Sequence, residues 1–443
     1  MLDDENHWPV PLVELTTTNG LRFVTDNAGV VAFDAPEFMR RETWIEVCSH
    51  GYEVPADGLG NRGVRVTPEP GGSTRIAIQR RQIARRLGCI TGAGIFAESQ
   101  KLGGFSDWRE SGVCGSDSTQ LAAYKNKLFW LWGDTGVPSY PLGIFNVPAA
   151  TTPLNPLSSF QPPVALVFDY MVDAQGAPRG TIRIPGNGPV WISGLVSLPD
   201  GKGVEHLVAT WSKIHEPLKA GETGLAEWND ATSSFEPLFT LWKRSDTEPD
   251  PPALIPDGPA AICNDAAGRA WLYAGGPPHF KCPPLYEGWK DRSRWMPVDN
   301  PRSFPAADGG ADVAVASASI AWSGYRKRWL MILQQKSGSP SAFGEIWYLE
   351  GASPEGPWGR AVKVATHRNH TFYNVRIDWQ LSEPSAPFLL FEGTYTTTFS
   401  DNPIKTPRYE YNQLLYRINL DDPALKPAQS GSGNSPGCDG LHQ

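Results

Sequence analysis

"GSDSTQLAAYKNKLFWLWGDT", residues 115–135, decides the fold and contains the first candidate site. A run of small and apolar residues, a polar two-residue turn and an aromatic run predict two antiparallel strands joined by a tight hairpin. If Tyr124 pairs with Lys127, the continued ladder places Asp117 directly opposite Asp134. Opposed side chains in a hairpin have Cβ atoms about 5 Å apart. We therefore expect two carboxylates at the mouth of one strand pair.

Hairpins of the same composition recur along the chain about every 60 residues. Further examples are "VWISGLVSLPDGKGVEHLVATWSKI", "AAICNDAAGRAWLYAGG", "SIAWSGYRKRWLMILQQK" and "VRIDWQLSEPSAPFLLFEGTY". Together with the more polar strands that follow them, these units predict a five-bladed β-propeller over residues 114–425. A β-sandwich with long insertions is the alternative, because the units resemble one another only weakly.

The first 80 residues have a different spacing. Between residues 9 and 80, short apolar runs alternate with turn signals such as Asn19-Gly20, which predicts a small β-sandwich. With "SHGYE" at residues 49–53, this segment resembles the prealbumin-like (carboxypeptidase regulatory-like) sandwich, a resemblance that implies a supporting role without catalysis. Residues 81–113 are predicted to connect the two domains, and residues 426–443 to form a flexible tail. The predicted fold class is all-β.

Composition limits the function. The 443 residues include 41 prolines and 45 glycines and carry a net charge of -8, which argues against a nucleic-acid partner. The basic run "RRQIARR" near residue 80 could bind an anion, but arginines paired with acidic neighbours are the favoured interpretation. No apolar run is long enough for membrane insertion. Localisation and oligomeric state stay open, with a periplasmic or secreted location favoured if a signal peptide was removed. The six cysteines are interpreted as buried thiols, with one or two bridges as the alternative.

Carboxylates are the main candidate catalytic groups. A close pair such as Asp117 and Asp134 tends to share one proton, which leaves one acid and one base or nucleophile. The alternative is that both are turn residues that cap backbone N–H groups. Glu345 starts a strand of the fourth unit, and Glu392 ends a buried apolar run of the fifth. Glu345 could join the pair or be an ordinary strand-edge acid. Glu392 could join the pair or form a structural ion pair with Arg376 or Arg408.

Aromatic, amide and guanidinium side chains near the predicted mouth are candidate substrate-binding residues, because aromatic faces stack on sugar rings and polar groups bind hydroxyls. The candidates are Trp132, Tyr140, Trp191, Asn374, Arg376, Tyr395, Arg408, Tyr409, Tyr411 and Asn412. No metal site is predicted, because His367 and His370 have no third ligand nearby and are interpreted as surface histidines. No cofactor is predicted; a structural calcium is possible but the sequence does not indicate one.

The assembled motifs "GSDS", "LFWLWGDT", "GEIWYLE", "FYN", "FEGTYT" and "TPRYEYNQLLYRINLDDP" resemble a bacterial family that joins a sandwich to a propeller. More distantly, they resemble five-bladed glycoside hydrolases of the endo-D-arabinanase and arabinanase type. That resemblance implies that Asp117 and Asp134 are the catalytic pair and that Glu345 is a further acid. The chain departs from this pattern at Val375, where relatives tend to have proline followed shortly by a histidine.

The sequence thus predicts a glycoside hydrolase that acts on a furanoside-containing or related polysaccharide. The alternatives are a carbohydrate-binding propeller without catalysis and a protein-interaction scaffold. An enzyme should place its two carboxyl groups about 5 to 9.5 Å apart at an open aromatic cup, whereas a scaffold should bury them in ion pairs.

Overall fold

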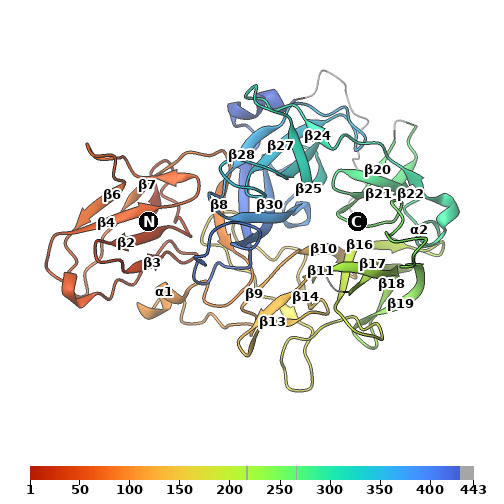
Figure 1. Cartoon of the computed structure of the whole chain (residues 1–443), viewed down its shortest axis with the longest axis horizontal. Helices are drawn as coiled ribbons and strands as arrows, with labels where there is room; N and C mark the ends of the chain where they lie inside the picture. Colours follow the sequence, from red (N-terminus) through yellow and green to blue (C-terminus); the bar gives the residue numbers. More distant parts are fainter. Residues whose placement is uncertain (216–217, 266, 430–443) are drawn as a thin grey trace.

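The computed structural model describes residues 1–215, 218–265 and 267–429, and Figure 1 shows the arrangement of the strands. Strands dominate the described residues, which confirms the predicted all-β class. The two α-helices in these residues, α1 (Ala97–Lys101) and α2 (Tyr286–Lys290), have five residues each. None of the helices described is long and apolar enough to cross a membrane.

The N-terminal part of the chain forms two small sheets. One has the order β3 (Arg22–Val24), β2 (Glu14–Thr17), β4 (Thr43–Cys48) and β6 (Gly63–Val66); the other has β1 (Leu2–Asp3), β7 (Ala77–Arg80) and β5 (Tyr52–Glu53). Alternating side chains of the strands and the segments beside them share one buried core, which includes Val13, Leu15, Val47, Val54 and Ile78. Because β1 pairs with β7, this unit starts before residue 9, where the sequence predicted it to begin.

Five further antiparallel sheets surround a common centre (Figure 1). The first is β10 (Gln120–Tyr124), β11 (Lys127–Leu131), β14 (Ala149–Thr152) and β15 (Asp169–Tyr170), and the second is β16 (Val190–Pro199), β17 (Glu205–His215), β18 (Lys219–Asn229) and β19 (Ser234–Lys243). The third is β20 (Ala260–Asn264), β21 (Ala270–Gly275), β22 (Pro278–Cys282) and β23 (Met296–Pro297). The fourth is β24 (Ser303–Phe304), β25 (Val313–Ser323), β26 (Arg328–Gln335), β27 (Ile346–Gly351) and β28 (Val362–Ala365). The fifth is β29 (Thr371–Ile377), β30 (Phe388–Thr396), β31 (Asn412–Asn419) and β8 (Arg85–Cys89).

Strand β8 corrects the prediction for residues 81–113. The segment was expected to be only a connection, but Arg85–Cys89 pairs with β31 and supplies the outer strand of the fifth sheet. All five residues are buried. The charge of Arg86 is accommodated because its guanidinium donates to the carbonyl oxygen of Leu12 at 3.1 Å and to the hydroxyl of Ser49 at 2.6 Å. An early strand therefore ties the last sheet to the N-terminal sheets.

The predicted tail begins later than expected. A 3₁₀ helix, η4, spans Pro423–Ala428, and its Leu425 and Ala428 side chains are buried against the fifth sheet's core. The remainder of the tail, residues 430–443, lies outside the described residues, as does Cys438. Cys48, Cys89, Cys114 and Cys282 are unbridged thiols; Cys89 and Cys282 are buried as expected, whereas Cys48 and Cys114 are exposed.

The opening hairpin has the register that its turn predicts. Tyr124 pairs with Lys127, and the two turn residues, Lys125 and Asn126, have φ of 47° and 61°. Two successive positive φ values are typical of the type I′ turn, whose twist matches that of the flanking strands. The same pairing continues into a small outer sheet of β9 (Gly115–Ser116), β12 (Thr135–Val137) and β13 (Tyr140–Ile144), where Thr135 faces Ser116. The register is the same in both sheets, although residues 117–119 and 132–134 between them lie outside the strands.

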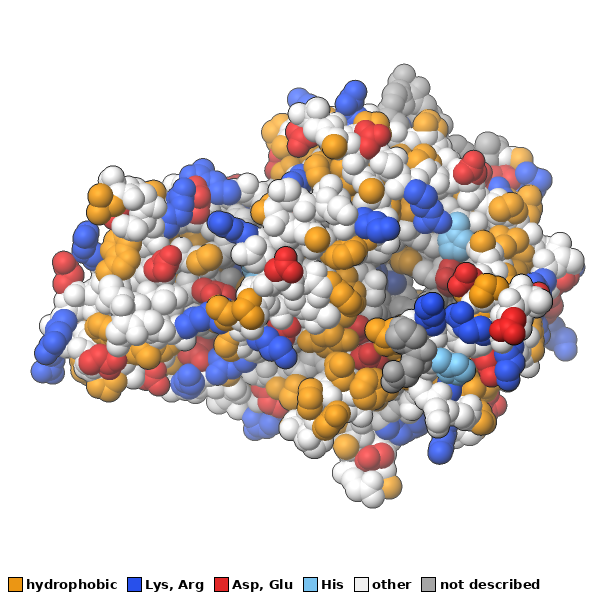
Figure 2. Space-filling model, in the orientation of Figure 1, with side chains coloured by type: hydrophobic (Ala, Val, Ile, Leu, Met, Phe, Trp, Pro, Cys, Tyr) orange, Lys and Arg blue, Asp and Glu red, His pale blue; other side chains and the backbone are white. Residues whose placement is uncertain are grey.

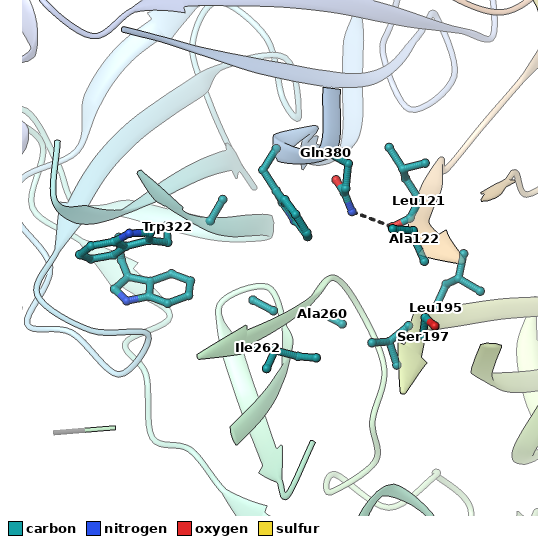
Figure 3. Close-up of a pocket in the computed structure, with 14 residues that line it drawn as sticks. Leu121, Ala122, Leu195, Ser197, Ala260, Ile262, Trp322 and Gln380 are labelled. Atoms are coloured by element: carbon teal, nitrogen blue, oxygen red, sulfur yellow. Dashed lines mark hydrogen bonds between the residues drawn. The ribbon is translucent and has the colours of Figure 1, made fainter. Parts of the chain in front are cut away.

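A mostly apolar cavity lies where the first strands of the sheets converge (Figure 3). It is lined by Leu121 and Ala122 of β10, Leu195 of β16, Ile262 of β20 and Trp322 of β25. Gln380 also lines it and donates to the carbonyl oxygen of Leu121 at 3.0 Å. Asp117 and Asp134 are not among the residues that line this cavity.

Charges of both signs are interspersed on the face shown in Figure 2. Most arginines of the basic run pair with acids, as the sequence led us to favour: Arg80 and Arg85 contact Glu5 at 2.8 Å each, and Arg81 contacts Glu53 at 2.7 Å. This part of the surface is consequently neutralised by local ion pairs.

Candidate active site

The aspartates at the two ends of the opening hairpin are neighbours. The N–H of Asp117 donates to the carbonyl oxygen of Asp134 at 3.2 Å, and the N–H of Gly133 donates to the carbonyl oxygen of Asp117 at 2.8 Å. Both side chains are half-buried. The charge of Asp117 contributes to the raised pKa of Asp134, so the two carboxyl groups are close enough to interact electrostatically.

Asp117 accepts hydrogen bonds from two tyrosines, Tyr373 of β29 and Tyr411, which directly precedes β31. Tyr373 donates its hydroxyl to Oδ2 at 2.6 Å, and Tyr411 donates to the same oxygen at 2.8 Å. The other oxygen, Oδ1, accepts no hydrogen bond from any described residue. Burial raises the pKa of Asp117, and the two tyrosine hydroxyls oppose this rise because they stabilise the carboxylate.

Asp134 has a simpler environment. Its Oδ1 accepts a hydrogen bond from the indole Nε1 of Trp191 at 3.1 Å. Burial, followed by the charge of Asp117, raises the pKa of Asp134 to about 6. Within the described residues neither aspartate has a lysine or arginine partner within ion-pair distance. The pair is therefore poised to hold one proton near neutral pH.

The backbone around the pair is strained. Ser118, Asn374 and Tyr411 have φ of 56°, 53° and 58°, a region that residues other than glycine seldom adopt. The Asn374 amide donates to the hydroxyl of Ser118 at 2.6 Å, which links the first sheet to the fifth. Such conformations persist only where surrounding contacts enforce them, and they cluster at functional sites.

Glu345 does not join the pair in the described contacts. Its side chain is fully buried, and it forms an ion pair with Lys363 at 2.9 Å and accepts a hydrogen bond from Thr366 at 2.8 Å. Burial raises the pKa of Glu345, and Lys363 lowers it. The expectation that Glu345 presents a carboxylate to the cup is wrong, because the strand start turns this side chain towards β28.

Glu392 also belongs to a buried network. It lies opposite Arg376 in the ladder of β29 and β30, and it accepts a hydrogen bond from Thr119 at 3.3 Å. Arg376 in turn donates to Asp378 at 3.1 Å and to the carbonyl oxygen of Leu121 at 3.0 Å. Burial and the adjacent charge of Asp378 raise the pKa of Glu392. The predicted ion pair of Glu392 with Arg376 or Arg408 is absent from the described contacts, because Arg376 is ion-paired with Asp378 and Arg408 with Glu98.

Of the ten candidate binding residues, three contact the pair or the segment beside it: Trp191, Asn374 and Tyr411. Tyr140 is 62% exposed on β13, in the small sheet that continues from the hairpin. Five others have structural contacts: Arg376 as above, Tyr395 with His50, Arg408 with Glu98, Tyr409 with the carbonyl oxygen of Thr25, and Asn412 with Thr91.

Trp132 is a further correction. Its side chain is fully buried and packs on Trp130, Phe168 and Tyr170 inside the first sheet's core. It cannot contact a substrate, because the layer that covers it is supplied by the segment leading into β15. Sequence alternation indicated the face of the strand but not this cover.

The histidines of "HRNH" are buried, which corrects their interpretation as surface residues. His367 is hydrogen bonded to the carbonyl oxygen of Gly344 and to the hydroxyl of Tyr416, both at 2.8 Å. His50 of the N-terminal part packs on His370 with ring centroids 4.9 Å apart. Burial lowers the pKa of His367 to about 3. Among the described residues, no group of three or more His, Cys, Asp or Glu is arranged to hold a metal ion.

Two residues of the site were missed as candidates. Tyr373 directly precedes Asn374, and both contact residues 117–118 because Asn374 has a positive φ and the register of β29 shifts after Tyr373. Regular side-chain alternation would have placed only one of them at the site. Gly133 has no side chain to suggest a role, yet a Cβ built there would lie 2.1 Å from Oδ1 of Asp117. The glycine therefore makes room for the free oxygen of the acid pair.

Comparison with known proteins gives structural neighbours only. No family model matches the sequence, and no curated protein matches it. An exo-1,5-α-L-arabinanase from a bovine ruminal metagenomic library is 12% identical with a TM-score of 0.39, covering 70% of this chain and 94% of that one. An α-L-arabinanase mutant from Cellvibrio cellulosa is 8% identical with a TM-score of 0.40, covering 69% and 92%. An exo-β-1,3-galactanase from Phanerochaete chrysosporium is 12% identical with a TM-score of 0.40, covering 79% and 66%.

Proposed function

We propose that this protein is a glycoside hydrolase that acts on a furanoside-containing or related polysaccharide, with Asp134 as the general acid and Asp117 as the base or nucleophile. The observation that carries the proposal is the pair itself: two half-buried carboxylates opposed across one hairpin, with no cation to neutralise them among the described residues. We further propose that the five sheets are the blades of a propeller and that the N-terminal sheets form a supporting sandwich.

The two roles follow from the different partners. The oxygen of Asp117 that accepts both tyrosine hydroxyls is stabilised as a carboxylate, and its other oxygen, which is buried, has no hydrogen-bond partner among the described residues. Asp134 has a raised pKa of about 6, so it keeps its proton in mildly acidic solution and can deliver it to a leaving oxygen. Because burial raises the pKa of both carboxyl groups, the two roles are assigned from their hydrogen-bond partners: two hydroxyls stabilise the Asp117 carboxylate and one indole N–H contacts Asp134.

Trp191 and the tyrosines would bind the substrate as well as position the two aspartates. Trp191 is partly exposed beside Asp134, so its ring can pack on the apolar face of a sugar while its Nε1 holds the acid. Tyr140 projects from the neighbouring hairpin and would contact a unit further along a polysaccharide. Asn374 is exposed and can donate to a hydroxyl group.

The alternatives make different predictions. A carbohydrate-binding protein would use the same aromatic and amide groups without bond cleavage. A protein-interaction scaffold has no need of two unneutralised carboxylates, whose mutual repulsion costs stability. The two unneutralised carboxylates therefore favour a site for acid–base catalysis over either alternative.

The test uses purified protein, Asp117→Asn, Asp134→Asn and the matched control Asp169→Asn, an exposed aspartate on β15 of the same sheet. Each is incubated with a panel of furanose-containing and pyranose-containing polysaccharides, and released oligosaccharides are quantified. We expect release by the unmodified protein and the control, with losses of at least about 100-fold in both site variants. Equal release by all four proteins, or none by any, would refute the proposal.

A further inference from the structure

Phe399 is an exposed aromatic residue with a left-handed backbone conformation. It lies in the loop between β30 and β31, its side chain is 64% exposed, and its φ is 65°. The N–H of Ser400 donates to the carbonyl oxygen of Thr397 at 3.1 Å, so Phe399 occupies the third position of a tight turn. Glycine or asparagine is the usual choice where this position needs a positive φ. A bulky aromatic residue there is a genuine outlier.

The ring lies beside the acid pair. Its centroid is 5.8 Å from that of Tyr373, with the two planes at 80°. The hydroxyl of Tyr373 is the one that donates to Asp117 at 2.6 Å. Phe399 is thus separated from the proposed nucleophile by a single side chain.

A second aromatic residue reaches the same place from the fourth sheet. Phe343 precedes β27, its φ is 56°, and its ring centroid lies 6.5 Å from that of Phe399. Two loops that are distant in sequence therefore both hold phenylalanines in the left-handed region, with the rings meeting at an edge. Strain at two converging residues indicates a shape that the surrounding structure enforces.

The loop is fixed at its base, so the ring is presented rigidly. The carboxylate of Glu410 accepts hydrogen bonds from the Thr396 hydroxyl at 2.7 Å and from the Thr397 N–H and hydroxyl at 2.9 Å each. The Ser400 hydroxyl also donates to the carbonyl oxygen of Thr397 at 2.7 Å. Such pre-organisation lowers the entropy that a ligand must otherwise remove on binding.

We propose that Phe399 is the aromatic platform of a sugar subsite that adjoins Asp117, and that it stacks on the apolar C–H face of one sugar ring of a polysaccharide. Phe343 and Tyr373 contact its edge and set its orientation. This inference rests on the proposed function for the identity of the ligand class. The exposed face of the ring gains its partner only when a ligand is bound, which accounts for an apolar side chain kept in solvent.

The decisive variant is Phe399→Gly, because it removes the ring and also relieves the left-handed backbone. Phe399→Tyr keeps a stacking face. Phe239→Ala, on the outer strand β19 of the second sheet, is the control for loss of an exposed aromatic ring. Melting temperature, release of oligosaccharides, and retardation in gels that contain each polysaccharide of the panel are measured for all of them. The gel measurements are repeated in the Asp117→Asn background to separate binding from cleavage.

We expect Phe399→Gly to melt at or above the temperature of the unmodified protein while its binding weakens about tenfold, with Phe399→Tyr and Phe239→Ala close to unchanged. A lower melting temperature with unchanged binding would show that the ring only packs, and would overturn the subsite. If the unmodified protein binds but cleaves nothing, and binding depends on Phe399, the subsite stands and hydrolysis fails. If it cleaves and Phe399→Gly cleaves and binds equally well, hydrolysis stands and the subsite fails. Absence of both binding and cleavage overturns both proposals.

Discussion

Replacing Gly133 by alanine places a methyl group where Asp117 keeps its free carboxylate oxygen. The added Cβ would lie 2.1 Å from Oδ1 of Asp117, and ordinary contact begins near 3.4 Å, so the oxygen must move by about 1.3 Å. Gly133 does not have a positive φ, so alanine suits its backbone and the effect is steric. The carboxylate is the mobile partner, because Gly133 belongs to the hydrogen-bonded ladder.

A displacement of this size should lower the reaction rate and also weaken the hydrogen bonds that hold Asp117. A misplacement of about 1 Å in a reacting group costs about 100-fold in rate. The rotated carboxylate also loses good geometry to the hydroxyls of Tyr373 and Tyr411, and a hydrogen bond to a charged group contributes about 1.5 to 3 kcal/mol. Because Asp117 is half-buried and can regain water, we expect the free energy of unfolding to fall by about 1 to 3 kcal/mol.

The assay compares kcat/KM on the best polysaccharide of the panel and the free energy of unfolding by denaturant titration. Gly136→Ala is the matched control, since this glycine lies in the same hairpin and the nearest atoms to its added Cβ are 3.8 Å away. We expect Gly133→Ala to lose about 100-fold in kcat/KM and Gly136→Ala to lose less than about threefold. If the two variants behave alike, the positioning of Asp117 by the cleared space over Gly133 is refuted.

Three further outcomes test the electrostatics. Asp134 has a pKa of about 6 and must be protonated to act as an acid, so kcat/KM should fall about tenfold per pH unit above pH 6, and a profile flat from pH 5 to 8 contradicts this role. The folded-state pKa of His367, about 3, lies below its unfolded value near 6.5, so the unfolded chain binds the proton first as the pH falls. The free energy of unfolding should therefore decrease below about pH 6.5, by about 2 kcal/mol between pH 6.5 and 5. His367→Gln should reduce that pH-dependent difference in denaturant titrations, whatever its effect at pH 7. Glu392→Gln should lower the free energy of unfolding by less than about 1 kcal/mol and preserve activity, because the raised pKa of Glu392 indicates a neutral side chain. Glu392→Ala should lower the free energy of unfolding by about 2 to 4 kcal/mol, because it leaves a cavity. Equal losses of stability in the two variants would mean that the charge of Glu392 is essential.

Local sequence was sufficient to predict the acid pair. A two-residue turn fixes the pairing of its flanking residues, and each further pair follows by counting, so the opposition of Asp117 and Asp134 needed no information from elsewhere in the chain. The burial of Glu392 was likewise predictable from the apolar run that it ends, but its partner was not: Arg376 is its neighbour in the ladder, and the ion pair of Arg376 is with Asp378.

Contacts with segments that are distant in sequence were not predictable in the same way. Strand β8 has the composition of a basic linker, and only its partner β31, more than 300 residues away in sequence, makes it a strand. Trp132 lies two residues before Asp134, so regular alternation would place both on the same face of the strand and suggested that Trp132 binds substrate. In the structure, Phe168 and Tyr170 pack on the Trp132 ring. Side-chain alternation specifies a face of the strand, whereas burial depends on which distant segment packs over that face.

The candidate site depends on a local contact, the hairpin that pairs the two aspartates, and on long-range contacts, the hydrogen bonds from Tyr373 and Tyr411 to Asp117. The acid pair is fixed by one hairpin, so it should persist through local fluctuations of the rest of the molecule. The tyrosine hydroxyls that bind Asp117 are distant in sequence: Tyr373 lies in β29 and Tyr411 directly precedes β31, 256 and 294 residues from Asp117. Both hydrogen bonds lower the pKa of Asp117, and they form only while the fifth sheet is packed against the first. The pKa of Asp117 therefore depends on that contact between sheets, whereas the pairing of the two aspartates depends on the hairpin alone.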